Sequence, residues 1–126
     1  MYHSHSFESW ASRVPGWKIV MPSDTLDAYG LLLSAIVDPN PVMVLLPKAL
    51  LRMRSERLIP GEPEDPQELS RRIDAPIGDR KNWTPDWPDV QEYFVPIGSA
   101  RLVREGETAT VISYGRTLPV CVQVAD

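Results

Sequence analysis

The sequence predicts an α/β fold, centred on a β-strand, a helix and a second β-strand that follow one another between residues 17 and 46. Residues 17–21 and 42–46 are short runs of β-favouring side chains, and prolines bound both of them. The intervening residues up to about Val37 read as a helix. Strand, helix and strand in this order make a βαβ unit with a right-handed crossover, so we expect a partial parallel sheet. Its two strands should be adjacent or separated by one other strand.

A short amphipathic helix is expected ahead of the first strand. Apolar side chains recur there at helical spacing, at Phe7, Trp10, Ala11 and Val14. Ser4 or Ser6 is available as its N-cap, and Pro15-Gly16 provides the stop signal.

The helix between the strands should begin with Ser23 or Asp24 as its capping residue. It should end before residues 38–41, Asp-Pro-Asn-Pro, because a proline and the residue before it both resist helical geometry. The run at 42–46 is apolar without alternation, which suits a strand covered on both faces. Residues 47–54 should then form a short basic helix or turn.

Residues 55–92 have a different composition, with six of the 13 prolines, many charged side chains and few branched aliphatic ones. We expect a long surface excursion, anchored by Trp83 and Trp87 against an apolar surface, with partner binding by this pair as the alternative. Five of the arginines between residues 52 and 80 are interleaved with acidic residues, which favours a solvated face over a phosphate site. They are Arg52, Arg54, Arg71, Arg72 and Arg80.

A β-hairpin and a helix are predicted for the remaining residues. The hairpin strands are 99–104 and 108–113, and Gly106 suits a turn position with positive φ. Thr117 is a plausible N-cap for the helix, and Pro119 falls in its first turn, where the missing N–H costs little. Cys121, the single cysteine, is expected as a small buried hydrophobe on this helix, and a lone cysteine allows no internal disulfide.

The composition argues against two classes of function. A net charge of -4 is unsuited to a nucleic-acid surface, which needs clustered excess Lys and Arg. No apolar run approaches the roughly 18 residues that a bilayer span requires, and the N-terminal residues lack the features of a signal peptide, so we expect a cytoplasmic protein. A Gly-x-Ser-x-Gly nucleophile elbow is absent from the sequence, as are a Gly-rich phosphate loop and an Asp-rich magnesium motif.

Six short motifs stand in order along the chain. They are YHSHSFESW at residues 2–10, VPGWKIV at 14–20, GLLLSAI at 30–36 followed by Asp38 and Asn40-Pro41, PIG at 96–98, VREG at 103–106, and SYGR at 113–116. Each motif is weak by itself, but their order and gaps together resemble an internal part of one protein family. That family is the β subunit of the E1 component of thiamine-diphosphate-dependent 2-oxoacid dehydrogenases, of the branched-chain 2-oxoisovalerate and pyruvate type.

The resemblance implies a division into three segments. Residues 1–54 would be the C-terminal part of the transketolase-like, pyrimidine-binding domain. Residues 55–94 would be the surface excursion or linker, and residues 95–126 would begin the transketolase C-terminal-like domain. The whole enzyme would decarboxylate a 2-oxoacid oxidatively and transfer the acyl group to lipoamide, together with an E1 α subunit and an E2 acyltransferase core.

The resemblance also implies an incomplete cofactor site. In the family, the glutamate that activates the aminopyrimidine precedes the part matched here, and the α subunit holds the diphosphate and its magnesium. Thiamine diphosphate and magnesium are therefore expected in the parent complex and not on this chain alone, which we expect to be inactive.

Two groups of site residues follow from the resemblance. His3 matches the family's active-site histidine, and imidazole suits proton transfer because its pKa lies near the operating pH. Ala35, Asp38 and Asn40 match positions that bind a monovalent cation such as potassium, largely through backbone carbonyls, with helix capping as the alternative. His5 stands where the family usually has Gln, and two histidines alone fall short of the three or four ligands that zinc requires.

Three functional hypotheses remain open from the sequence. The leading one is an E1 β fragment. The second is a non-catalytic, self-associating binding or assembly module, because a sheet without its other strands exposes edges and an apolar face. The third is a small free-standing enzyme that uses His3 and His5 with a bound metal.

Overall fold

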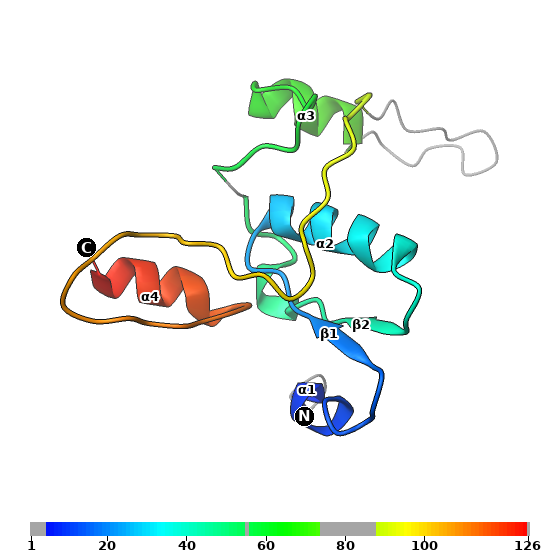
Figure 1. Ribbon diagram of the computed structural model, residues 1–126. Helices are drawn as coiled ribbons and strands as arrows, with labels where there is room; N and C mark the ends of the chain where they lie inside the picture. The colour runs from blue at the N-terminus through cyan, green and yellow to red at the C-terminus, as the bar shows by residue number, and fades with distance from the viewer. Residues whose placement is uncertain (1–4, 55, 74–87, 126) are drawn as a thin grey trace.

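The structure is a computed structural model that describes residues 5–54, 56–73 and 88–125. Figure 1 shows its elements in chain order. They are α1 (Glu8–Ala11), β1 (Lys18–Val20), α2 (Thr25–Val37), β2 (Val42–Val44), the 3-10 helix η1 (Lys48–Leu50), α3 (Pro66–Ile73) and α4 (Thr117–Ala125). The predicted α/β class is confirmed, and so are the strand, helix and strand between residues 17 and 46.

The sheet consists of β1 and β2, which are adjacent and parallel as expected. Lys18 pairs with Val42 at the start of the strands and Val20 pairs with Val44 at their end. The crossover helix α2 lies along one face of this pair (Figure 1). All three residues of β2 are only half-buried, so the expected cover on both faces is wrong for this chain. The apolar run of β2 would need a second layer, which the described residues do not supply.

Helix α2 begins as the sequence predicts. Asp24 is its N-cap, in extended conformation, and its Oδ1 accepts a hydrogen bond of 2.8 Å from the backbone N–H of Asp27. The helix ends at Val37, and its C-cap Asp38 returns to extended geometry ahead of Pro39. Among the described residues the buried apolar core is small, made by Ala11, Val20 and Leu26.

Helix α1 is shorter than expected, and its predicted serine cap is wrong. Phe7 is the N-cap, with no side-chain cap hydrogen bond, and Ser4 lies outside the described residues. Phe7 has φ -104° and ψ -3°, which is helical and unlike the extended geometry that brings a capping side chain over the first turn. The first turn instead depends on main-chain bonds from Trp10 and Ala11 to the carbonyl of Phe7, of 3.1 and 2.9 Å.

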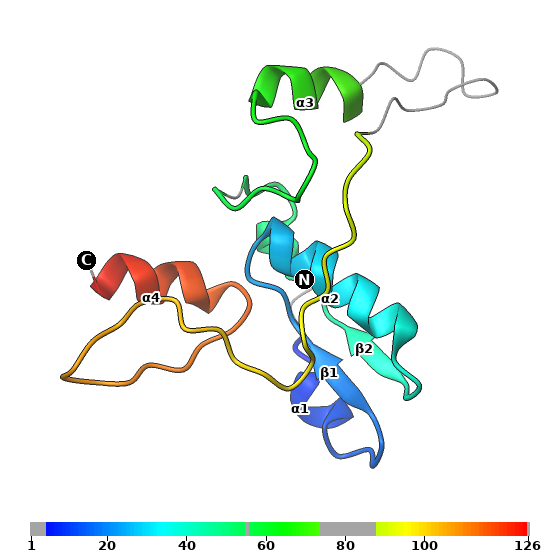
Figure 2. The same ribbon diagram turned by 45° about the horizontal axis from the view of Figure 1, so that its top comes forward.

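The predicted β-hairpin is also wrong. Neither 99–104 nor 108–113 forms a paired strand, and nearly all of these residues are exposed. Gly106 does not take a positive φ, whereas Gly98 (φ 93°) and Gly115 (φ 56°) do. An isolated two-stranded hairpin is marginal in water, so two strand-like segments and a turn residue are not sufficient without a surface to pack on. The segment instead forms a wide loop that returns to α4 (Figures 1 and 2).

The excursion is closed at its base. The backbone N–H of Gln91 donates to the carbonyl of Pro60 at 2.7 Å, and a Cβ at Gly61 would lie 2.8 Å from the carbonyl oxygen of Asp89. Helix α3, within the excursion, was not predicted, and its Arg72 pairs with Glu68 one turn earlier at 2.6 Å. Trp83, Trp87 and Arg80 lie outside the described residues. Residues 88–96 then run past α2 (Figure 2).

Helix α4 follows the prediction in position. It starts at Thr117, which is itself the first helical residue instead of the N-cap, and Pro119 lies in the first turn. The Oγ1 of Thr117 donates to the carbonyl of Tyr114 at 2.8 Å. Cys121 is half-buried instead of buried. Within the described ranges, no helix has the length and apolar character needed to span a bilayer.

Candidate functional site

The carboxyl edge of the sheet is the first place to look for a site, because ligands of parallel α/β sheets bind outside the carboxyl ends of the strands. The chain leaves β1 through residues 21–24 and enters α2 there, and it leaves β2 through Pro47 into η1. Gly115 closes the same edge, since a Cβ at this position would lie 2.5 Å from the Sδ of Met21 and 3.5 Å from Pro47. The edge therefore brings together residues far apart in the sequence.

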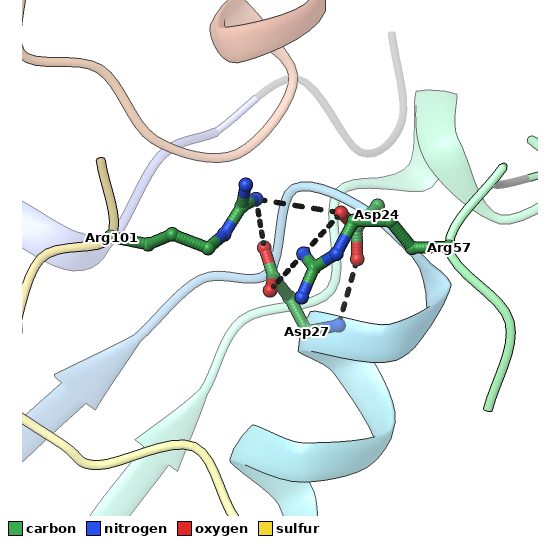
Figure 3. A network of polar contacts seen from close by, with 4 residues as sticks. All are labelled: Asp24, Asp27, Arg57 and Arg101. Atoms are coloured by element: carbon green, nitrogen blue, oxygen red, sulfur yellow. Dashed lines mark hydrogen bonds and ion pairs between the residues drawn. The ribbon is translucent and has the colours of Figure 1, made fainter. Parts of the chain in front are cut away.

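Four charged side chains form a network at this edge, around the N-terminus of α2 (Figure 3). The Arg57 Nη1 lies 2.7 Å from Asp24 Oδ2 and 2.9 Å from Asp27 Oδ1. The Arg101 Nη2 lies 3.5 Å from Asp24 Oδ2 and 3.4 Å from Asp27 Oδ2. The two carboxylates are 14% and 15% exposed, so they are largely withdrawn from water and face two guanidinium groups.

The electrostatics of the network favour the charged form of Arg57. Burial alone would lower the pKa of Arg57, but the hydrogen bonds that it donates to Asp27 and Asp24 outweigh burial and raise that pKa above its ordinary value. Both carboxylates also lie at the positive end of the α2 dipole, which stabilises negative charge. The network is therefore a set of compensated charges.

A cleft of about 220 Å³ adjoins the network. Its wall is partly charged and partly apolar, and the residues that line it are Asp27, Arg57, Tyr93, Val95, Pro96, Ser99, Ala100 and Arg101. A larger hollow of about 600 Å³ lies along the loop at residues 102–111, but only that exposed loop lines it. We therefore take the smaller cleft as the candidate site.

Of the two predicted histidines, His3 lies outside the described residues. His5 is exposed, and its ring centroid lies 5.8 Å from that of Phe7. Within the described ranges, no group of three or more His, Cys, Asp or Glu side chains could hold a metal ion. The structure thus places His5 at a tilted aromatic contact, and it leaves the role of His3 as a prediction.

The residues predicted for a monovalent cation lie at the end of α2. The Oδ2 of Asp38 is 2.6 Å from the Nζ of Lys18, and its Oδ1 accepts hydrogen bonds from the backbone and side-chain nitrogens of Asn40, at 2.9 and 3.0 Å. The Lys18 ammonium, followed by Asn40, lowers the pKa of Asp38 to about 2. The negative charge of this carboxylate is already compensated by the Lys18 ammonium. A bound cation here would therefore depend on main-chain carbonyls, including that of Ala35.

The described residues do not fit a diphosphate with magnesium. The guanidinium groups of Arg57 and Arg101 already face carboxylates, and the described ranges contain no cluster of metal ligands. A magnesium diphosphate needs oxygen ligands for the metal and donors for the phosphates. We therefore derive no catalytic step through this cofactor.

Sequence reasoning missed most of the network. Asp24 was expected only as a cap, and Asp27, Arg57 and Arg101 were not singled out. The acidic pair at the start of the helix was a usable signal. The helix dipole compensates only about half of one negative charge, so two carboxylates near the same helix end also attract cationic side chains. The cations themselves lie 33 and 74 residues from their partners, a separation that no local pattern encodes.

Comparison with known proteins assigns the chain to a family. Residues 1–54 match the transketolase pyrimidine-binding domain. The chain is 33% identical to the mitochondrial 2-oxoisovalerate dehydrogenase subunit β of Dictyostelium discoideum over 99% of its own length and 26% of the relative's. It is 36% identical to the 2-oxoisovalerate dehydrogenase subunit β of Bacillus subtilis, with 100% and 29% covered. With the human mitochondrial pyruvate dehydrogenase E1 component subunit β, identity is 32%, with 98% and 27% covered.

The chain thus spans between a quarter and a third of the length of these curated relatives. No solved structure matches the chain significantly. The similarity nevertheless extends beyond the pyrimidine-binding match, because it continues through the excursion and α4 to the last residues. The chain therefore belongs to the family of 2-oxoacid dehydrogenase E1 β subunits, with residues 1–54 in its transketolase-like, pyrimidine-binding domain.

Proposed function

We propose that this chain is a part of an E1 β subunit whose whole enzyme performs the thiamine-diphosphate-dependent oxidative decarboxylation of a 2-oxoacid, with acyl transfer to lipoamide. The observation that carries the proposal is the identity of about a third with 2-oxoisovalerate and pyruvate dehydrogenase β subunits over nearly the entire chain. The parallel β1-α2-β2 unit supports it, because it is consistent with a transketolase-like domain.

In this proposal the chain acts within a larger assembly. Its partners are an E1 α subunit and an E2 acyltransferase core, and thiamine diphosphate and magnesium belong to the assembled complex. His3 moves a proton near the substrate, since it stands at the position of the family's active-site histidine. Potassium at the end of α2 would use the main-chain carbonyls near Ala35, Asp38 and Asn40.

A chimera tests the proposal directly. The matching residues of the Bacillus subtilis 2-oxoisovalerate dehydrogenase subunit β are replaced by the 126 residues of this chain, because the two align over the full chain. The chimera is expressed with its α subunit and assayed for 2-oxoacid decarboxylation. We expect assembly and activity, whereas an assembled chimera with no activity would contradict the proposed function.

The chimera also tests the role of His3. His3→Ala should lower kcat by roughly 100-fold or more with a smaller effect on KM, the scale expected for a lost proton-transfer group. His5→Gln is the matched control, because His5 lies two positions from His3 and the substitution introduces the residue that the family usually has there. Equal activity of His3→Ala and the unmodified chimera would remove His3 from the mechanism.

The isolated chain is expected to be inactive. Purified chain would be incubated with thiamine diphosphate, magnesium and 3-methyl-2-oxobutanoate, and carbon dioxide release would be measured. The expected result is no release above the rate without protein. Robust turnover would show that the chain by itself contains a complete site.

A second candidate function, a non-catalytic self-associating module, is favoured by one observation. Helix α2 exposes Leu32, Ile36 and Val37 at 49%, 70% and 66% of their surface. Contiguous exposed apolar surface of this kind marks an interaction site or an uncovered core. Sedimentation velocity over a range of concentrations would distinguish the two, since a persistent monomer would contradict this second candidate.

A further inference from the structure

The charged network at the start of α2 connects all three segments into which the sequence divides. Asp24 and Asp27 belong to residues 1–54, Arg57 to residues 55–94, and Arg101 to residues 95–126. The two arginines approach the same pair of carboxylates from opposite sides (Figure 3). One cluster therefore ties the start of the excursion and the segment that follows it to the same helix.

The segment that leads to Arg101 is fixed to α2 at two points before it reaches the network. The hydroxyl of Tyr29 donates to the carbonyl of Gln91 at 3.1 Å. Further along, the backbone N–H of Val95 donates to the carbonyl of Gly30 at 3.3 Å, and the Oγ of Ser34 donates to the carbonyl of Val95 at 2.7 Å. These bonds position residues 91–95 along α2.

Beyond Pro96, ion pairs replace neutral hydrogen bonds as the contacts between this segment and α2. Residues 98–101 are exposed, and the backbone bond from Ser99 to Pro96 is local to the loop. At Arg101 the side chain returns to Asp24 and Asp27. Charge, in contrast to the neutral hydrogen bonds at Val95, is thus what holds the loop beyond Pro96 at the N-terminus of α2.

We propose that Asp24, Asp27, Arg57 and Arg101 form an ionic latch that holds residues 96–101 at the N-terminus of α2. When the latch opens, the segment can undock from residue 101 back to Val95, the first hydrogen-bonded residue behind it, while β1, α2 and β2 stay folded. The latch also forms one wall of the 220 Å³ cleft, since Asp27, Arg57 and Arg101 all line it. Undocking would therefore open the cleft. This inference does not depend on the proposed function.

The physical basis is that the latch responds to conditions that leave the rest of the fold unchanged. Raising NaCl from about 0.1 M to about 1 M shortens the Debye length from roughly 10 Å to 3 Å and weakens partly exposed ion pairs. Hydrophobic contacts and neutral hydrogen bonds within α2 are not weakened in this way. A latch built from charge should open before the helix does.

The test is amide hydrogen exchange of the 126-residue chain, observed by NMR at the Val95 amide beside the latch. An amide in the middle of α2 reports on the helix, and the Gln91 amide, bonded to Pro60 at 2.7 Å, reports on the distant base of the excursion. Between low and high salt we expect exchange at Val95 to rise about two- to fivefold, the range of one partly exposed ion pair, with exchange in α2 unchanged. Equal salt responses at Val95 and α2, or none at Val95, would overturn the proposal.

Variants provide the second arm. Asp27→Asn and Arg101→Gln should each accelerate exchange at Val95 at low salt. The effect of the double variant should be less than the sum of the two single effects, because the Arg101–Asp27 contact is lost in both single variants. Asp24→Asn keeps the helix cap, since Asn caps as well as Asp does, and removes only the charge. Additive effects of Asp27→Asn and Arg101→Gln would contradict a shared latch.

The matched control is Arg72→Gln. Arg72 makes an ion pair of 2.6 Å with Glu68 within α3, away from the latch, so its loss should leave exchange at Val95 unchanged. If a latch variant also accelerates amide exchange in α2, the variant has destabilised the helix. The dependence of Val95 exchange on salt in the unmodified chain then tests the proposal. An Arg72→Gln effect at Val95 as large as that of Arg101→Gln would mean that net charge, and not the latch, controls the segment.

Discussion

Lys18, the first residue of β1, contacts Asp38, the C-cap of α2, at a distance of 2.6 Å between Nζ and Oδ2. Lys18 is also paired in register with Val42, the first residue of β2. The ion pair therefore fixes the turn between α2 and β2 at the edge of the sheet opposite the latch. Asn40 completes the turn by donating two hydrogen bonds to the other oxygen of Asp38.

This contact predicts a specific dependence of stability on pH. The pKa of Asp38 in the folded chain is about 2, below its ordinary value of 3.8, because Lys18 and then Asn40 stabilise the carboxylate. A lowered folded pKa means that the contribution is complete above about pH 4 and is lost as pH falls toward about 2. Asp38→Asn should therefore lower the melting temperature at neutral pH and have little effect near pH 2.

Melting curves between neutral pH and pH 2 provide the measurement for this prediction. Glu107→Gln is the control, since Glu107 lies on the exposed loop and should leave the pH profile of stability unchanged. Parallel pH profiles for Asp38→Asn and the unmodified chain would show that the Lys18 contact contributes nothing to folding.

Gly30 is predicted to be essential for docking residues 93–95 on α2. A Cβ at this position would lie 2.6 Å from Cγ2 of Val95 and 2.9 Å from Cδ1 of Tyr93. Alanine favours helix by about 1 kcal/mol over glycine, so without the clash Gly30→Ala would stabilise the chain. We expect net destabilisation by roughly 1 to 3 kcal/mol, as for other overpacked sites, in chemical denaturation. Gly106→Ala, where nothing lies within 4 Å, should change stability little.

Leu26 and Leu32 should differ strongly in their contribution to stability. Leu26 is 8% exposed and Leu32 is 49% exposed. Leu26→Ala should cost roughly 2 to 5 kcal/mol, as for a buried leucine, whereas Leu32→Ala should cost about 1 kcal/mol or less in the monomer. Urea denaturation measures both. A large and concentration-dependent cost at Leu32 would indicate that a second chain covers this face of α2.

Comparing alanine substitutions at Gly115 and Gly16 distinguishes the effect of backbone strain from that of a steric clash. Both have positive φ, 56° and 84°, and an L-residue there costs roughly 1 to 2 kcal/mol. Only at Gly115 would a Cβ also meet a neighbour, the Sδ of Met21 at 2.5 Å. Gly115→Ala should therefore destabilise the chain more than Gly16→Ala does. The double variant Gly115→Ala with Met21→Ala should be less destabilised than the two single effects predict, as measured by thermal melting.

The sequence by itself determined the β1-α2-β2 unit and the position of α4. These elements follow from local rules, because Asp24 can cap a helix, Pro39 and Pro41 cannot continue one, and short runs of branched side chains favour strands. The six motifs were equally local and carried the family resemblance, which the comparisons confirmed. The roles of His3, Ala35, Asp38 and Asn40 in the chemistry stay predictions.

Only the tertiary structure decided what depends on contacts between distant residues. The predicted strands at 99–104 and 108–113 form no hairpin, because a hairpin needs a surface to pack on. The burial of α2 side chains was likewise a matter of what covers them, and Leu32 is half exposed here. The latch is the clearest case, since no local pattern in the sequence singles out Arg57 or Arg101. Their pairing with Asp24 and Asp27 exists only because folding brings three segments to one helix end.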